Sequence, residues 1–121
     1  MSGMADPHDF ALRWIAAWNA RDLEAVLELF SEDAVFTSPL AARLMPESGG
    51  IVRGKPALRD YWRLALDRVP ALHFELTSLY SGADSLLIGF RNNEGLDRFE
   101  VLRFRGGVVV EGHGTYQLPL G

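Results

Sequence analysis

The main hydrophobic period of the chain changes at Pro70, and this change constrains the fold more than any other feature of the sequence. Before Pro70 most apolar residues recur every three to four positions, which is the period of an amphipathic helix. After Pro70 they alternate with polar residues, which is the period of a half-buried strand. A helical first half followed by strands predicts an α+β domain whose helices pack against one face of a sheet.

Three segments before Pro70 carry the helical period. The first runs from Pro7 to Asn19 with Asp6 as its candidate N-cap, and the second begins after Asp22, another candidate N-cap. The third opens at Gly54-Lys55-Pro56 and ends at Pro70. The predicted buried stripes are Phe10, Trp14, Ala17 and Trp18 in the first helix, Leu23, Val26, Leu27 and Phe30 in the second, and Leu58, Tyr61, Trp62, Ala65 and Leu66 in the third.

Five segments are predicted as strands. The first, 34–37, is short and stops at Pro39, because proline cannot donate to a sheet ladder. Residues 40–52 contain two turn signals and no clear period, so we expect an apolar loop that lies over a site. The other four strands are separated by turn clusters and cover residues 73–80, 85–92, 96–105 and 108–118.

Composition narrows the class of protein. The 121 residues suit one domain, 1–121, and 48% hydrophobic with 23% charged residues is ordinary for a globular chain. A net charge of −4 without a basic cluster disfavours nucleic-acid binding, and no run approaches the roughly 20 apolar residues that span a bilayer. The chain has no cysteine and begins without a charged start followed by an apolar run, so we expect a cytoplasmic protein. Neither a cofactor nor a metal is expected, since His8, His73 and His113 share no metal-ligand spacing.

Alternation along the last strand assigns its faces. Gly112 and Gly114 weaken a strand, and either a cavity above them or a bulge accounts for their presence. The predicted inward face comprises Val108, Val110, Gly112, Gly114 and Tyr116, and the outward face Val109, Glu111, His113 and Thr115.

The strand before it makes Glu100 the most informative residue of the chain. If Leu102 and Phe104 face the core, alternation places Glu100 and Arg98 on the same face. An ionised carboxylate among apolar side chains is costly, so it takes a partner or a proton. Two interpretations stay open: a pocket acid that exchanges a proton with a ligand, or an ion pair with Arg98 or Arg103 that only satisfies the sheet.

Aromatic and polar residues supply the candidate site. Glu100 is the candidate catalytic residue, while Ser38 either caps a loop or binds a polar group of the ligand. Aromatic residues at these spacings also occur in ordinary cores, so part of the set belongs to the core. The predicted ligand-binding residues are Trp14, Trp18, Phe36, Ser38, Trp62, Arg98, Leu102 and Tyr116.

Four segments in order carry a family resemblance over nearly the whole chain. They are residues 14–24 (WIAAWNARDLE), 29–36 (LFSEDAVF) with Ser38-Pro39, 53–62 (RGKPALRDYW), and 102–104 (LRF) before Gly106-Gly107. Together they resemble the SnoaL-like and ketosteroid isomerase-like branch of the nuclear transport factor 2-like superfamily. The resemblance implies a cystatin-like fold, in which a cone-like curved antiparallel sheet packs against three N-terminal helices.

The resemblance also bears on chemistry. Ketosteroid isomerases use a tyrosine, an aspartate base and a protonated acid, and Trp14, Ser38 and Glu100 stand at those three positions. Since indole is not an acid and a serine hydroxyl is a poor base, steroid isomerisation by that route is not expected. Residues 98–100 (RFE) also resemble the arginine and acid of limonene epoxide hydrolases, but glycines occupy the places where a second carboxylate is needed.

These observations favour a small-molecule-binding domain with an apolar pocket. The first hypothesis is an acid/base enzyme of isomerase, cyclase or hydratase type on a polyketide-, steroid- or terpenoid-like compound. The alternative is a non-catalytic ligand-binding or dimerisation module. The resemblance and the mixed outer sheet face of Phe99, Val101, Val109 and His113 also predict a homodimer through that face.

Overall fold

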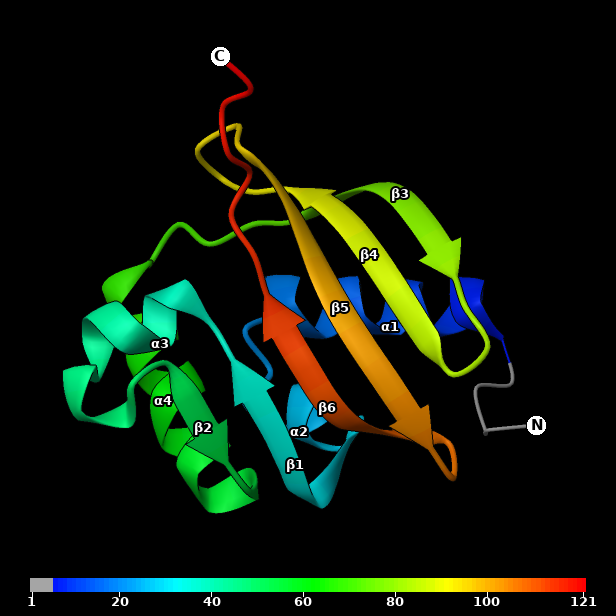
Figure 1. The fold of residues 1–121 in the computed structure, drawn as a ribbon, viewed down its shortest axis with the longest axis horizontal. Coiled ribbons are helices and arrows are strands. Elements are labelled where there is room, and N and C mark those ends of the chain that lie inside the picture. Colours follow the sequence, from blue (N-terminus) through cyan, green and yellow to red (C-terminus); the bar gives the residue numbers. More distant parts are fainter. Residues whose placement is uncertain (1–5) are drawn as a thin grey trace.

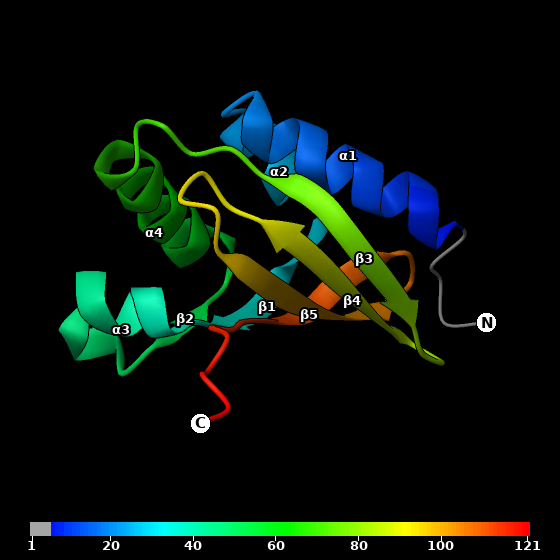
Figure 2. The ribbon, with the colours of Figure 1, turned by 90° about the horizontal axis from the view of Figure 1, so that it is seen from above.

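Six strands form one curved sheet, and helices cover one of its faces (Figures 1 and 2). The computed structural model describes residues 6–121. All neighbouring strands are antiparallel except β1 and β6, which run parallel. The sheet is therefore mixed, whereas an antiparallel sheet was predicted. The strands are β1 (Phe30–Thr37), β2 (Ile51–Arg53), β3 (Glu75–Ser81), β4 (Ser85–Arg91), β5 (Asp97–Arg105) and β6 (Val108–Gly114), in the order β2-β1-β6-β5-β4-β3.

The expected helices are present, with one boundary corrected. α1 (Pro7–Asn19) is capped by Asp6, whose side chain accepts from two backbone amides, and α4 (Lys55–Arg68) follows Gly54. α2 (Leu23–Leu27) is shorter than predicted, because Phe30 begins β1 instead of closing the helix. Within the described residues, no helix has the length and hydropathy that a bilayer crossing requires.

The segment expected to be a loop contains regular structure instead. Ser38-Pro39 ends β1, as predicted, but it also starts α3 (Pro39–Leu44), because the Ser38 hydroxyl accepts from the Leu40 amide and proline suits a first helical turn. A short 3₁₀ helix (Pro46–Ser48) and β2 follow, and β2 pairs with β1. The prediction of a loop over residues 40–52 was therefore wrong.

A β-bulge in β6 changes which residues face inward. Arg103 pairs with Glu111 while Phe104 pairs with Val109, so Val110 is an extra residue on β6. The bulge shifts the alternation by one position, and Val109 is fully buried whereas Val108 and Val110 are not. The predicted faces are therefore correct for positions 111–114 and wrong for positions 108–110.

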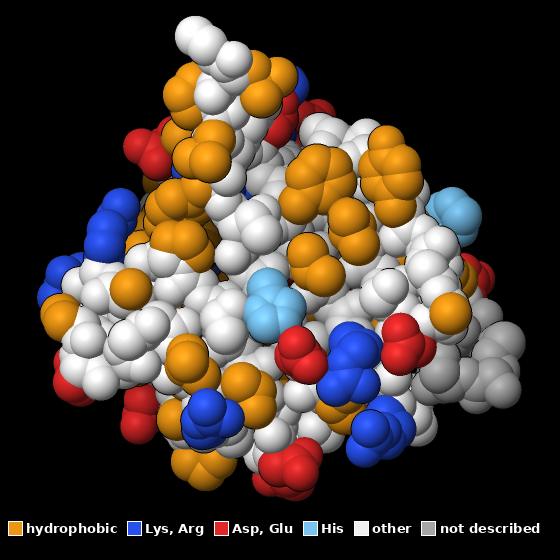
Figure 3. Space-filling view, viewed as in Figure 1, with side chains coloured by type: hydrophobic (Ala, Val, Ile, Leu, Met, Phe, Trp, Pro, Cys, Tyr) orange, Lys and Arg blue, Asp and Glu red, His pale blue; other side chains and the backbone are white. Residues whose placement is uncertain are grey.

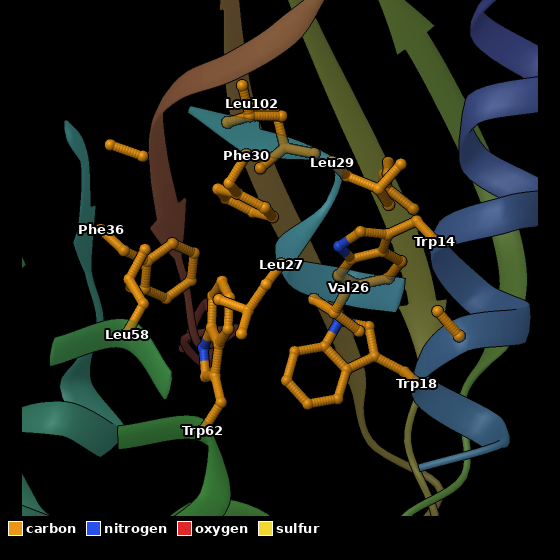
Figure 4. Close-up of a cluster of buried hydrophobic side chains, with 14 of the residues drawn as sticks. Trp14, Trp18, Val26, Leu27, Leu29, Phe30, Phe36, Leu58, Trp62 and Leu102 are labelled. Carbon is orange, nitrogen blue, oxygen red and sulfur yellow. The ribbon is translucent and has the colours of Figure 1, made fainter. Parts of the chain in front are cut away.

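The core lies between the inner sheet face and the helices, and aromatic rings dominate it (Figure 4). Trp14 from α1 stacks on Phe74 with ring centroids 5.6 Å apart, and Trp18 meets the edge of Trp62 from α4 at 5.5 Å. Phe30 of β1 packs on Trp62 at 5.0 Å. These contacts join both long helices to the sheet, and the same rings continue into the pocket described next.

Candidate functional site

A pocket of about 400 Å³ opens between the inner sheet face, α4, and the turn that joins β4 to β5. Its size lies within the range of small-molecule sites. Aromatic residues are frequent in its lining, which also includes the charged side chains of Arg43, Glu94 and Arg98. The residues predicted from sequence that line it are Trp14, Trp18, Phe36, Ser38, Trp62, Arg98, Glu100 and Tyr116.

Leu102 is the one predicted ligand-binding residue that is absent from this lining. It faces inward on β5, as expected, but it is fully buried in the core opposite Gly112. A side chain at Gly112 would lie 2.8 Å from the Phe36 ring and 3.1 Å from Leu102, so glycine permits a close approach there. Side chains therefore fill the space over the Leu102–Gly112 pair. The cavity begins at the next inward-facing pair along these strands, Glu100 and Gly114.

Glu100 projects from β5 into the pocket without a partner. Within residues 6–121 it forms no hydrogen bond or ion pair, and protein encloses it while the pocket gives it partial access to solvent. Burial raises the pKa of Glu100 to about 8. At neutral pH the group is therefore mainly a carboxylic acid that can donate a hydrogen bond.

Neither arginine proposed as a partner of Glu100 forms an ion pair or hydrogen bond with it. Arg98 donates to the Asp97 carbonyl at 3.2 Å and stacks over the Tyr116 ring, with its guanidinium carbon 4.5 Å from the ring centroid. Arg103 binds Glu111 on the opposite sheet face at 3.0 Å. The ion-pair interpretation of Glu100 was therefore wrong.

Ser38 and Tyr61 form a hydroxyl pair in the pocket wall. The Tyr61 hydroxyl donates to Ser38 Oγ at 3.1 Å, and the Leu40 amide donates to the same oxygen at 3.0 Å. Burial raises the pKa of Tyr61 to about 12, although the hydrogen bond with Ser38 acts in the opposite direction. Tyr61 thus stays a neutral donor at every pH of interest, and Ser38 both caps α3 and lines the pocket.

Tyr61 is the main site residue that sequence reasoning missed. We assigned it to the buried stripe of the third helix and predicted Tyr116, not Tyr61, as the tyrosine of the pocket. A signal was present, because a tyrosine in a buried stripe needs a partner for its hydroxyl. The other lining residues outside the predicted ligand-binding set are Leu40, Arg43, Ala65, Val69, Leu72, Phe74, Phe90, Asn92, Asn93, Glu94, Leu96 and Thr115, together with Gly114, which was predicted to face inward.

The outer sheet face carries a different cluster of polar groups, beside gathered hydrophobic side chains (Figure 3). His113 lies outward, as predicted, with Nδ1 2.6 Å from Thr37 Oγ1 and Nε2 2.7 Å from Glu111 Oε2. Phe99 and Val101 are on this face, but Val109 is buried in the core, which corrects its predicted place. Among the described residues, no group of three His, Cys, Asp or Glu side chains could hold a metal ion.

A second hollow of about 370 Å³ lies against β3, β5 and the segment after β6. It shares Arg98, Thr115 and Tyr116 with the first pocket. Its other charged residues, Arg91 and Asp97, are bound to each other at 3.1 Å. The pocket at Glu100 is therefore the better candidate site, because its acid has no partner among the residues that the structure describes.

A helix-covered, mixed curved sheet of this kind is the fold class of solved structures described as nuclear transport factor 2-like and cystatin-like. Within that class the chain belongs to the SnoaL-like domain family, whose model matches residues 11–116. No curated protein matches the chain significantly.

Several solved structures resemble this chain over most of its length. A SnoaL-like protein of unknown function from Burkholderia thailandensis is 35% identical, with a TM-score of 0.87 over 93% of this chain and 94% of that chain. TerC, co-crystallised with polyporic acid, is 16% identical with a TM-score of 0.76 over 93% and 92%. A proposed polyketide cyclase from Sinorhizobium meliloti is 16% identical with a TM-score of 0.74 over 88% and 94%. The last two show the fold alone.

Proposed function

We propose that this protein binds a small, largely apolar ring compound in the pocket and that Glu100 exchanges a proton with it. The observation that carries the proposal is an unpartnered acid, with its pKa raised to about 8, among aromatic rings. A group that titrates near neutral pH can serve as general acid and, once ionised, as general base. This chemistry fits an isomerase, cyclase or hydratase acting on a polyketide-, steroid- or terpenoid-like substrate.

The lining supports such a substrate. Trp14, Trp62 and Phe90 are among its aromatic lining residues, and a volume of about 400 Å³ admits a compound of a few fused rings. TerC was co-crystallised with polyporic acid, and a proposed polyketide cyclase shares the fold. The reaction differs from that of ketosteroid isomerases, because Trp14 and Ser38 replace their tyrosine and aspartate, so proton transfer depends on Glu100.

Turnover by a Glu100→Gln variant tests the proposal. A panel of polyporic acid and ring ketones first identifies a compound that the wild-type protein converts. Glutamine preserves shape and hydrogen bonding but cannot exchange a proton, so we expect kcat to fall about 100-fold or more while the Kd changes less than about threefold. Glu75→Gln, at an exposed position of β3, is the matched control and should convert the compound normally. Unchanged kcat in Glu100→Gln would exclude proton exchange at this residue.

A non-catalytic binding module is the second candidate. Trp14 and Ser38 stand where the isomerases have two of their three functional groups, which favours binding without conversion. Under this alternative, compounds that bind in the pocket and raise the melting temperature are recovered unchanged after prolonged incubation. Conversion of any bound compound that depends on Glu100 would reject the alternative.

We also propose that two copies associate through their outer sheet faces. Phe99 is 37% exposed there and Tyr80, whose ring lies 6.3 Å from it, is 61% exposed. Apolar surface of this kind is typical of faces that a partner covers. The pocket opens on the opposite side of the sheet, so association leaves it accessible.

A further inference from the structure

Ser38 and Glu100 approach the same spot in the pocket from two sides of Gly114. Gly114 on β6 pairs with Glu100 on β5, and β1, which ends just before Ser38, is the other neighbour of β6. A methyl group placed on Gly114 would lie 3.4 Å from Ser38 Oγ and 3.6 Å from Glu100 Oε1. The missing side chain therefore leaves a space that both oxygens border.

The hydroxyl pair leaves one proton available for this space. Ser38 and Tyr61 carry two hydroxyl protons, and their mutual hydrogen bond uses one of them. Ser38 Oγ accepts two hydrogen bonds, one from the Leu40 amide and one from the Tyr61 hydroxyl. Its own proton is then free to point into the pocket. Tyr61 is 2% exposed, which leaves Ser38 as the member of the pair that a ligand can reach.

Glu100 supplies the second donor. Its carboxyl group has no partner within residues 6–121, and in its protonated form it presents an O–H to the pocket. Two donors that border one space are complementary to an oxygen with free lone pairs. Apolar ligand groups would leave both donors without a bond.

We infer that Ser38 and Glu100 form a two-donor cradle above Gly114 for a single carbonyl or phenolic oxygen of the ligand. This inference deepens the proposed function and rests on it, because the pocket must first bind a ring compound. It narrows the substrate to a ring ketone or phenol. Two donors aimed at a carbonyl oxygen also stabilise negative charge that develops on that oxygen when a neighbouring C–H loses a proton.

Binding of 1-tetralone and its hydrocarbon counterpart tetralin tests the cradle. They share the ring body, and only the ketone offers an oxygen. We expect wild-type protein at pH 6 to bind 1-tetralone at least about fivefold more tightly than tetralin in isothermal titration calorimetry. Gly114→Ala should weaken 1-tetralone binding about tenfold and tetralin binding less than twofold, because the new methyl makes only ordinary contacts, at 3.4 Å or more, in the fold. Val69→Ile, which adds a methyl to another part of the wall, should affect both probes alike.

The pH dependence gives a second readout. Between pH 6 and pH 9 the wild-type protein should lose about fivefold to tenfold in affinity for 1-tetralone, because an ionised carboxylate only accepts. Tyr61, Tyr116, Arg43, Arg98 and Glu94 share the pocket with Glu100, so Glu100→Gln isolates its effect. That variant keeps an N–H donor and should bind 1-tetralone with nearly constant affinity over this range.

The outcomes separate the two proposals. If both probes bind equally and Gly114→Ala weakens both alike, the cradle is wrong while the binding pocket stands. If neither probe binds, the proposed function for this class of ring compound fails, and the cradle with it. Wild-type affinity for 1-tetralone that rises with pH would also overturn the cradle, since the ionised form would then be the binding form.

Discussion

The carboxyl group of Glu100 links the stability of this protein to pH. In an unfolded chain the group ionises around its ordinary pKa of 4.5, whereas the folded protein raises that pKa to about 8. Between these pH values unfolding releases a proton, so the free energy of unfolding decreases as the pH rises. The contribution of Glu100 to the free energy of unfolding is therefore complete below pH 4.5. It decreases as the pH rises and is lost once the pH passes about 8.

Urea unfolding at pH 5 and pH 8.5 measures this effect. Relative to Glu100→Gln, whose amide does not titrate, the wild-type protein should lose about 2–4 kcal/mol of unfolding free energy between the two pH values, allowing for the water that the pocket admits. The comparison with the variant cancels the contributions of other titrating groups. Parallel pH profiles for the two proteins would show that Glu100 ionises normally in the folded state.

At the scale of elements, Asn19 joins the end of α1 to the segment that enters β3. Its side-chain amide donates to the Phe74 carbonyl at 2.9 Å, and its oxygen accepts from the Phe74 amide at 2.7 Å. Phe74 stacks on Trp14 and lines the pocket. One side chain thus satisfies a backbone pair outside the sheet and fixes an aromatic wall of the site.

Replacement of Asn19 by alanine should therefore be costly. Two hydrogen bonds are lost and the partly buried amide and carbonyl of Phe74 lose their partners, so we expect about 2–3 kcal/mol lower unfolding free energy in urea titrations. Asn93→Ala, at an exposed position of the β4–β5 turn, should change it by less than about 0.5 kcal/mol. Equal stability of the two variants would mean that water replaces the Asn19 bonds without loss.

At the scale of the whole molecule, the outer sheet face is the surface through which we propose that the 13.4 kDa chain dimerises. Across the strands, Val101 lies between Leu87 and His113, so apolar and polar groups meet near its position. The Glu111 carboxylate is paired with Arg103 and hydrogen-bonded with His113, which lets this polar cluster enter an interface without leaving an unpaired charge.

Light scattering at micromolar concentration should give a mass near twice 13.4 kDa for the wild-type protein. Val101→Glu introduces a charge into the proposed interface and should give a mass near that of one chain. Leu12→Glu provides the matched control, since Leu12 is 60% exposed on α1, away from the sheet face, and this variant should remain dimeric. A wild-type mass near 13.4 kDa would reject the dimer.

The sequence predicted much of the architecture and the key acid. Capping by Asp6 and the stripe of Trp14 and Trp18 fixed α1 correctly, and alternation with Leu102 and Phe104 correctly turned Glu100 inward. Local periodicity suffices for such predictions, because residues of one element share a face whatever packs against it. We did not predict that Ser38-Pro39 begins α3, because the same dipeptide also ends a strand.

By itself, then, the sequence determined an α+β domain, its principal helices and strands, and an acid that faces the interior. Tertiary structure alone decided that Val109 rather than Val110 is buried, that Tyr61 binds Ser38, and that Glu100 lacks the partner its neighbouring arginines seemed to offer. The physical reason is distance along the chain. A bulge, a hydroxyl pair and an unpaired acid depend on how segments far apart in sequence align, and local patterns carry no information about that register.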